Sequence, residues 1–297
     1  MKRFIKHILF LIGVLLVLLF VLDALYTKVY RESVPRNKVA NLMAYKGDAI
    51  DYVFIGSSRV DNTIDAALIE RKTEKTAINL GVQGGKLDDY YLMLQLLVDK
   101  KIQTETVFIQ LDYVYNIDGT SEILKSELMP YIENPIIDAY VKERDLSYKT
   151  LRYVPFVRYM KFDYKIGFRE FFSSSIGKLP KTNLSNGYSP KYNSQGATLK
   201  YSLPTKMAAT NSVIQKIEKL ANDHQINLIF FTAPFCGATQ NFEYIDQLKE
   251  RFPTLIDYSR VFVDRDDYFY NCSHLNHKGA QEFTNLFVKA YLQTPPN

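Results

Sequence analysis

Two residues have surroundings that suit nucleophilic catalysis. One is a serine early in the chain, and the other is a histidine near its end. The sequence YVFIGSSR reads as a short apolar strand that ends in Gly56 and continues into the polar start of a helix. Ser58 would stand at this strand-to-helix turn, where the positive end of a helix favours an alkoxide. Serines also occupy such turns simply as N-caps. The turn alone therefore leaves a nucleophile and a structural serine as alternatives.

A serine nucleophile needs a base close to its hydroxyl. The chain has four histidines, of which His7 flanks the N-terminal apolar segment and His224 lies at a polar helix end. His274 and His277 follow an aromatic stretch and lead into the last predicted helix. We expect His274 to reach the same sheet edge as Ser58, and His277 to lie on the solvated start of the helix.

The elements that must position these two residues alternate along the chain. Apolar strands are predicted at 52–55, 76–82, 105–113 and 226–234, and helices at 61–72, 86–101, 207–225, 241–252 and 277–293. Asp61 or Asn62 is the expected N-cap of the first of these helices. Apolar strands separated by helices indicate a parallel sheet covered on both faces. The expected fold is a doubly wound, three-layer α/β sandwich of the flavodoxin-like kind, with sites at the carboxyl ends of its strands.

The first 30 residues predict a membrane anchor. Lys2, Arg3 and Lys6 precede an uninterrupted apolar run over residues 8–22. With adjoining apolar residues the segment reaches about 22 residues, or about 33 Å as a helix, which is enough to cross a bilayer core. No small-x-small cleavage site follows, so we interpret it as an uncleaved anchor and not a cleaved signal. The positive-inside rule predicts a cytoplasmic N-terminus, with the main domain outside the inner or cytoplasmic membrane, in a periplasm or on the wall side.

The rest of the chain is predicted to form a stem at 31–47 and one α/β domain at 48–297. This domain is interrupted at about 114–205 by a segment rich in Tyr, Pro, Ser and Asn. Its length exceeds that of ordinary connections, which indicates an inserted cap of helices and loops. A composition of 47% hydrophobic and 23% charged residues excludes a disordered chain. The net charge of +5 comes from scattered basic residues, so we expect no nucleic-acid partner.

The order of short motifs along the chain resembles the SGNH (GDSL-like) hydrolase superfamily. IGSSR resembles the first block of that family, NLGVQGG the second and NCSHLNHKGA the last. The resemblance implies that Ser58 is the nucleophile, that His274 is the base and that Gly84 belongs to the oxyanion hole. Asn116 is a loose match to the side-chain donor of the third block. Asn271 stands where the family carries its catalytic aspartate.

The asparagine at position 271 defines two functional hypotheses. An amide oxygen can orient an imidazole, but it supplies no charge to the imidazolium that forms during catalysis. In a serine protease the matching Asp-to-Asn change lowers turnover by about four orders of magnitude. Asp264, Asp266 or Asp267 would restore the charge if their loop folded back to His274. Otherwise the chain is a slow enzyme, or a degenerate member that binds without catalysing.

The resemblance also implies a place of action. Anchored members of the family resemble proteins that pass acyl groups to surface polymers beside a multi-pass membrane acyltransferase. We therefore expect an extracytoplasmic acyl-ester hydrolase or O-acyltransferase acting on cell-envelope polysaccharide or a related polymer, without a cofactor. Its expected partners are the membrane, the acylated carbohydrate or envelope polymer, and such an acyltransferase. The alternative is a binding or assembly component of the same kind of system.

Three further features have competing interpretations. Arg59 would bind a carboxylate or phosphate of the substrate, or pair with a neighbouring aspartate. Cys236 and Cys272 lie on loops predicted at the same sheet edge, and an exported compartment permits a disulfide between them. Two separate buried thiols are the alternative. His274 and His277 have poor spacing with the nearby acidic residues for a metal, so no metal site is expected.

Overall fold

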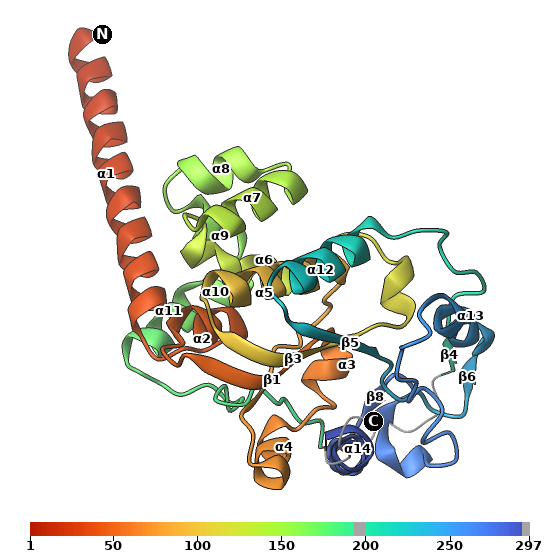
Figure 1. Cartoon of the computed structure of the whole chain (residues 1–297). Helices are drawn as coiled ribbons and strands as arrows, with labels where there is room; N and C mark the ends of the chain where they lie inside the picture. Colours follow the sequence, from red (N-terminus) through yellow and green to blue (C-terminus); the bar gives the residue numbers. More distant parts are fainter. Residues whose placement is uncertain (193–199, 293–297) are drawn as a thin grey trace. The chain divides into compact units, whose positions relative to one another are not determined.

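The computed structural model describes residues 1–192 and 200–292 (Figure 1). Contacts within the chain divide it into two compact units. The first comprises Met1–Ala44 with Lys125–Pro180, and the second comprises Tyr45–Leu124 with Lys181–Asn297. The segment expected as one insertion is therefore shared between the units. Its middle part packs with the N-terminal helix, whereas its two ends remain with the sheet.

The second unit is built around a parallel sheet, as the sequence predicts. Its strands are β1 (Ala49–Ile55), β2 (Ala77–Asn79), β3 (Gln103–Gln110) and β5 (Asn227–Phe231), in the order β2-β1-β3-β5. Phe54 of β1 lies opposite Asn79 on one side and Phe108 on the other. Ile256 adds one parallel bridge to Phe231 at the edge of the sheet. The strand order reverses at β1, because β2 lies on one side of it and β3 and β5 follow on the other, and α/β proteins form their sites at such a switch point.

Helices lie on both sides of this sheet (Figure 1). One side carries α4 (Ala66–Thr73) and α14 (His277–Phe287), and the other carries α5 (Leu87–Asp99) and α12 (Ser212–Asp223). Phe287 of α14 packs against Phe54, Phe108 and Phe231, with ring centroids 5.6, 5.2 and 5.5 Å away. The three strands and the last helix thus share one aromatic core.

The helix expected over residues 61–72 is present as two shorter pieces. α3 (Ser58–Asp61) begins directly after β1, with Ser57 as its N-cap. The N-cap of α4 is Asp65, whose Oδ1 accepts a hydrogen bond from the Leu68 amide at 3.1 Å. The expectation of Asp61 or Asn62 as N-cap is therefore wrong. Because α3 starts two residues after Gly56, Ser58 is the first residue of a helix.

Smaller elements complete the second unit. β4 (Tyr201–Ser202) pairs with β6 (Thr239–Gln240), and β7 (Phe269–Asn271) pairs with β8 (His274–Leu275). The remaining elements are α13 (Glu243–Arg251), the 3₁₀ helices η1 (Tyr113–Asn116) and η3 (Asp266–Tyr268), and the π-helical turn η4 (Val288–Leu292). The boundary between the units falls within α6 (Glu122–Leu128).

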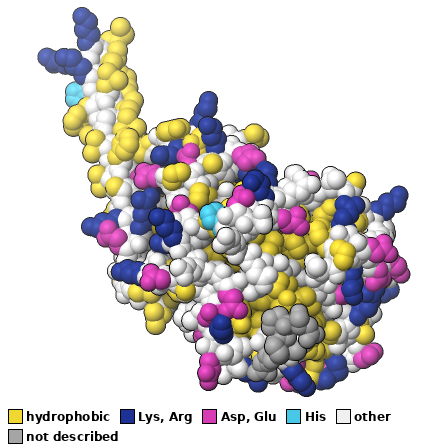
Figure 2. Space-filling view, viewed as in Figure 1, with side chains coloured by type: hydrophobic (Ala, Val, Ile, Leu, Met, Phe, Trp, Pro, Cys, Tyr) yellow, Lys and Arg dark blue, Asp and Glu magenta, His cyan; other side chains and the backbone are white. Residues whose placement is uncertain are grey.

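The first unit is helical throughout its regular structure. It contains α1 (Lys2–Glu32), α2 (Lys38–Ala44), η2 (Met129–Tyr131), α7 (Pro135–Arg144), α8 (Tyr148–Tyr153), α9 (Val157–Lys161), α10 (Asp163–Ile166) and α11 (Phe168–Ser175). An 18-residue window of α1 has a mean hydropathy of 3.1 and is not buried inside the protein. Figure 2 shows hydrophobic side chains along this helix and basic ones at its free end. α1 is long and apolar enough to span a membrane, and it continues past residue 30 into the predicted stem.

We predict that Phe287→Ala lowers the free energy of unfolding by about 3–5 kcal/mol, because it leaves a cavity between α14 and three strands. Urea titration followed by circular dichroism measures the change. Glu282→Ala is the matched control, since Glu282 is exposed on the same helix and surface substitutions usually change stability by about 0.5 kcal/mol or less. Equal losses in the two variants would contradict the aromatic core.

Candidate active site

The structure brings Ser58 and His274 into direct contact. Ser58 begins α3 after β1, and His274 begins β8 after a two-residue turn from β7. The Ser58 Oγ and His274 Nε2 atoms are 2.7 Å apart. This distance suits a hydroxyl that donates to an imidazole nitrogen, the contact that a serine nucleophile needs with its base.

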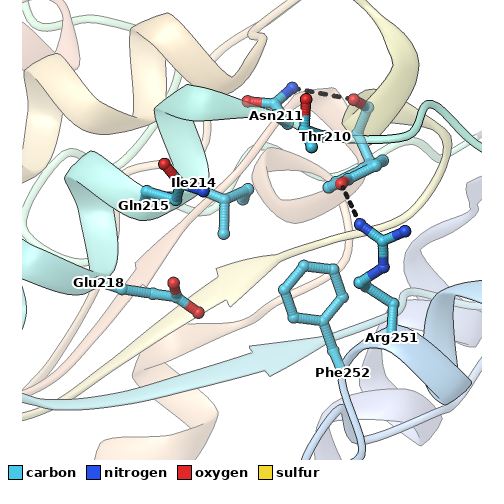
Figure 3. Close-up of a pocket in the computed structure, with 8 residues that line it drawn as sticks. Thr210, Asn211, Ile214, Gln215, Glu218, Arg251 and Phe252 are labelled. Atoms are coloured by element: carbon cyan, nitrogen blue, oxygen red, sulfur yellow. Dashed lines mark hydrogen bonds between the residues drawn. The ribbon is translucent and has the colours of Figure 1, made fainter.

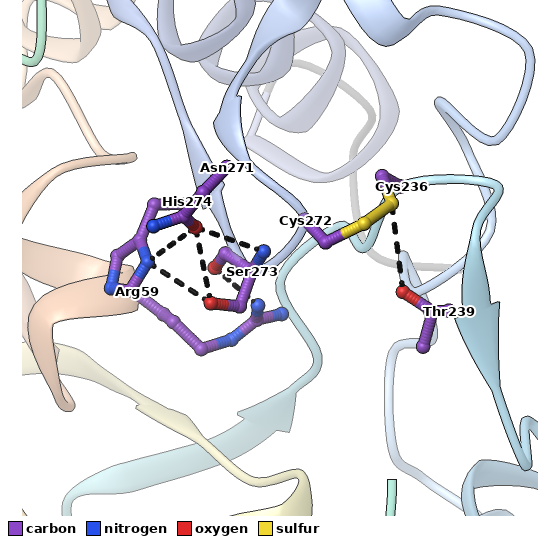
Figure 4. The surroundings of a disulfide bond; sticks show 7 residues. All are labelled: Arg59, Cys236, Thr239, Asn271, Cys272, Ser273 and His274. Carbon is purple, nitrogen blue, oxygen red and sulfur yellow. Dashed lines mark hydrogen bonds between the residues drawn. A yellow bond between two sulfur atoms is a disulfide. The ribbon is translucent and has the colours of Figure 1, made fainter. Parts of the chain in front are cut away.

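Asn271 contacts the other ring nitrogen of His274, Nδ1 (Figure 4). Its Oδ1 is 2.9 Å from His274 Nδ1, and it also accepts hydrogen bonds from the amide and hydroxyl of Ser273 at 3.1 and 3.2 Å. An amide oxygen can only accept, so Nδ1 carries the proton. Nε2 is then the unprotonated nitrogen that faces Ser58. The asparagine thus selects the tautomer in which the histidine can act as a base.

Burial holds the pKa of His274 at about 4, well below its usual value. The positive charges of Arg59 and Lys191 lower this pKa further, because they disfavour a second cation nearby. The imidazole is therefore neutral at physiological pH and free to accept a proton. The same surroundings oppose the imidazolium that would form once the proton has moved.

None of the acidic residues considered as substitutes for the family aspartate contacts His274 in the part of the chain that the structure describes. Asp264, Asp266 and Asp267 are all exposed. Asp267 accepts hydrogen bonds from Arg265 and Lys278, which hold the pKa of its carboxyl well below the usual range. The loop does not fold back, and the third position of the site is a neutral amide.

The Arg59 side chain is buried and bonded to other groups of the protein. Its side chain is 0% exposed, and its Nε donates to Asp112 Oδ2 at 2.9 Å. The two terminal nitrogens donate to the carbonyl oxygens of Ser273 at 2.5 Å and Ala233 at 2.6 Å. The guanidinium also lies 3.6 Å from the centroid of the Phe235 ring. Of the two interpretations drawn from the sequence, the geometry corresponds to the ion pair with an aspartate.

Gln110 and Asp112, which the sequence analysis did not single out, hold the serine turn and Arg59 in place. Gln110, at the end of β3, accepts hydrogen bonds from the amide and hydroxyl of Ser57 at 2.9 and 2.8 Å. Its side-chain amide donates to Asp112 at 2.7 Å. Both side chains are completely buried. A glutamine and an aspartate at the end of an apolar strand are the signal that the sequence offers, because buried polar groups need partners.

The loop after β2 lies against the serine turn. The Val82 amide donates to the Gly56 carbonyl at 2.8 Å, and the Asn79 side chain donates to the carbonyls of Val60 and Ile64 at 2.8 Å each. Gly84 has φ +67°, a conformation that favours glycine. Within the described residues, the amides of Ser58 and Gly84 donate no hydrogen bond. Both amides are therefore available to an oxyanion, and that role for them stays a prediction.

The Asn116 side chain is hydrogen-bonded to the 206–208 segment and to Tyr244. Its Nδ2 donates to the Lys206 carbonyl at 2.7 Å. Its Oδ1 accepts hydrogen bonds from the Ala208 amide at 2.9 Å and the Tyr244 hydroxyl at 3.1 Å. The side chain holds the 206–208 segment beside η1. A role for Asn116 as oxyanion donor stays a prediction from the resemblance.

Cys236 and Cys272 form a disulfide, the first of the two alternatives drawn from the sequence (Figure 4). Both residues are buried, and the Cys236 amide donates to the Cys272 carbonyl at 3.1 Å. Cys272 stands two residues before His274. The bond therefore ties the histidine hairpin to the loop after β5.

His277 and the neighbouring acids form no metal centre in the structure. The His277 amide donates to the Lys191 carbonyl at 2.6 Å, and its ring lies 3.1 Å from the Tyr188 hydroxyl. Across residues 1–192 and 200–292, no group of three or more His, Cys, Asp or Glu side chains could hold a metal ion.

A pocket of about 140 Å³ lies apart from these residues, between α12 and the end of α13 (Figure 3). It is lined by Tyr115, Thr210, Asn211, Ile214, Gln215, Glu218, Arg251 and Phe252. Arg251 is held by the Ala209 carbonyl at 2.6 Å, and burial raises the pKa of Glu218. The pocket contains none of the site residues expected from the sequence.

No protein-family model and no curated protein matches this chain. The assignment of a function therefore depends on the geometry above and on the resemblance of the motifs.

We predict that Arg59→Met lowers the free energy of unfolding by about 3–5 kcal/mol, because it leaves the Asp112 carboxylate buried without its partner. Adding Asp112→Asn should recover part of this loss, since the orphaned charge is removed. Urea unfolding of the single and double variants measures both effects. Arg260→Met, which breaks a surface ion pair, should cost much less. A double variant no more stable than Arg59→Met would count against the ion pair.

Proposed function

We propose that this protein is a membrane-anchored, extracytoplasmic serine acyl-ester hydrolase or O-acyltransferase that acts on cell-envelope polysaccharide or a related polymer. The single observation that carries the chemistry is the contact between Ser58 Oγ and His274 Nε2 at 2.7 Å, with Asn271 on the opposite ring nitrogen. The substrate class and the compartment are proposed from the resemblance to anchored SGNH-like proteins. The apolar α1 helix supports the anchor.

The first half of the reaction follows from the tautomer. His274 Nε2 takes the proton of the Ser58 hydroxyl as Oγ forms a bond to the ester carbonyl carbon. The tetrahedral oxyanion then collapses, the bond to the alcohol oxygen breaks, and His274 returns the proton to the departing alkoxide. The product is an acyl-serine at position 58 and a free alcohol, with no net change in charge.

The second half decides between hydrolysis and transfer. A water molecule or a sugar hydroxyl gives its proton to His274 and attacks the acyl-serine carbonyl. The second tetrahedral oxyanion collapses, the bond between the acyl carbon and Ser58 Oγ breaks, and His274 returns the proton to Oγ. Water yields a free acid, whereas a sugar hydroxyl yields a new ester. In both halves the amides of Ser58 and Gly84 are the proposed donors to the oxyanion. Asn116 is not included in this proposal, because its side chain is hydrogen-bonded to Lys206 and Ala208.

The neutral Asn271 limits the rate that this site can reach. A catalytic aspartate both orients the imidazole and stabilises the imidazolium of the transition state. Asn271 can do only the first, and the cations of Arg59 and Lys191 oppose the positive charge on His274. We therefore propose a slow enzyme.

The neutral side chain of Asn271 also favours one alternative function. In this alternative the protein binds or assembles the polymer without catalysing a reaction. In that case the Ser58–His274 contact is a remnant, and the hydroxyl does not react.

A serine-directed fluorophosphonate separates the two proposals. In the full chain reconstituted in nanodiscs, we predict covalent labelling that is lost in Ser58→Ala, because only a base-activated hydroxyl attacks the phosphorus. Ser57→Ala is the matched control and should still be labelled, since Ser57 is 5% exposed and bonded to Gln110. Mass spectrometry of the modified peptide gives the readout. A folded wild-type chain that takes no label supports the binding component, and a label on another residue overturns the proposed nucleophile.

The pH dependence provides a second test. His274 must be neutral to accept a proton, and its pKa lies at about 4. The rate of fluorophosphonate labelling, or of acetyl-ester hydrolysis, should therefore stay constant as the pH falls through 6.5 and decline only near pH 4. Asn271→Asp places a negative charge beside the imidazole and raises its pKa, which moves this decline to higher pH. The same variant should raise turnover, by up to about 10⁴-fold.

Two results would contradict this account of the base. One is a wild-type decline centred at or above pH 6.5, and the other is an Asn271→Asp profile identical to that of the wild type. Products formed in the presence of a sugar acceptor then distinguish transfer from hydrolysis.

A further inference from the structure

The first unit carries a group of apolar side chains that nothing in the unit covers. Leu146, Tyr153, Val154 and Met160 are each at least 44% exposed. We call these four residues the juxtamembrane patch. They lie just before α8, at its end and in α9. Figure 2 shows hydrophobic side chains at the surface over α8. Exposed apolar groups gathered in one region mark a surface that meets a partner or a membrane.

A pair of polar contacts fixes this region to α1 at a defined height. Asp23 directly follows Leu22, the last residue of the apolar run. Its carboxylate accepts hydrogen bonds from the Phe156 amide at 2.8 Å and from Arg158 Nη2 at 2.5 Å. Val154 is two residues before Phe156. The chain that bears the patch therefore meets α1 where its apolar run ends.

Aromatic packing holds the same region against the helix. The ring of Tyr26 lies 4.0 Å from that of Phe171, 4.9 Å from that of Phe156 and 5.2 Å from that of Tyr159. The Tyr159 hydroxyl and Thr27 Oγ1 are 2.7 Å apart. α1 and the segment around Phe156 are thus one packed assembly, and the depth of α1 sets the depth of the patch.

The depth follows from the geometry of a helix. Asp23 lies about 1.5 Å beyond Leu22 along the axis. The headgroup region on each side of the hydrocarbon core is about 6 Å thick. If α1 crosses a bilayer with residues 5–26 in the core, Asp23 and Phe156 lie about 4.5 Å inside the edge at which the core meets the headgroups. α8 and α9 also lie nearer to the N-terminal end of α1 than α11 does (Figure 1).

We propose that the juxtamembrane patch is a second membrane contact, which lies in the lipid leaflet nearer to the C-terminal end of α1. Its chemistry fits that place, because apolar side chains enter the edge of the core while the tyrosine ring prefers the interface. Lys149 of α8 is exposed and forms no ion pair within the described residues, so it is available to lipid phosphate. The contact fixes the orientation of the first unit on the bilayer. It depends on α1 as a span and is independent of Ser58.

The absence of tryptophan from the chain allows a direct test. Tyr153→Trp and Met160→Trp each introduce one fluorescent reporter into the full chain, reconstituted in phosphatidylcholine vesicles with brominated acyl chains. We expect blue-shifted emission and strong quenching by the bromines in both variants. Two reporters keep the test valid if one variant fails to fold.

Two controls bracket the depth. Leu15→Trp lies in the middle of the apolar run and should be quenched strongly if α1 spans the bilayer. Leu179→Trp is the matched control in the same unit, since Leu179 is 71% exposed. It is next to Lys178, whose carbonyl is bonded by Arg36, beyond the C-terminal end of α1. That end is about 15 Å past Leu22, so this reporter should remain accessible to aqueous iodide.

Equal iodide access at positions 153, 160 and 179 would overturn the proposal and leave a protein partner as the occupant of the patch. An unquenched Leu15→Trp would overturn it by removing the span. Neither result bears on the fluorophosphonate labelling of Ser58, so the two proposals fail separately.

Discussion

The geometry of the candidate site depends on the hydrogen bonds that the buried guanidinium of Arg59 donates. Arg59 follows Ser58 in the chain, and its Nη1 donates to the carbonyl of Ser273, the residue before His274. One cation therefore fixes the serine turn and the histidine hairpin relative to each other. A buried charge is tolerated only when it is paired and hydrogen-bonded, and Asp112 and two carbonyl oxygens after β5 meet this need. The disulfide joins the same hairpin to the same loop, because Cys236 follows Phe235, whose ring faces the guanidinium.

The strands and most helices of the sheet unit could be predicted from the sequence, because an apolar run between helices has few alternatives to a buried parallel strand. The division into units could not. Residues 125–180 pack with α1 through side chains such as Tyr26 and Phe171, and local patterns do not reveal such contacts. The break between α3 and α4 has the same origin. The Asn79 side chain donates to the carbonyls of Val60 and Ile64. These carbonyls therefore have a side-chain partner where α3 and α4 do not join into one helix.

Within the site, Ser58 and His274 were predictable because both stand where a parallel sheet collects its loops. The choice of partner for each polar side chain was not. Arg59 had an aspartate within reach, but Asp112 belongs to another strand and is selected by the fold. Asn116 matched a family position loosely, and the 206–208 segment, about 90 residues away in sequence, takes up its amide. Hydrogen-bond partners of this kind depend on long-range packing, whereas the end of a strand is a local property.

Asn271 separates two roles that an aspartate combines. Its single oxygen accepts from His274 Nδ1 and from two donors of Ser273, so the imidazole is oriented by an amide that is itself held in place. Orientation keeps the neutral base correctly placed at any pH above its pKa. Charge stabilisation matters only when the proton has moved, and here the cations of Arg59 and Lys191 lower the pKa of the ring. In the proposed reaction the neutral base is therefore in place before the proton moves, while the transition state lacks the electrostatic support that a catalytic aspartate would supply.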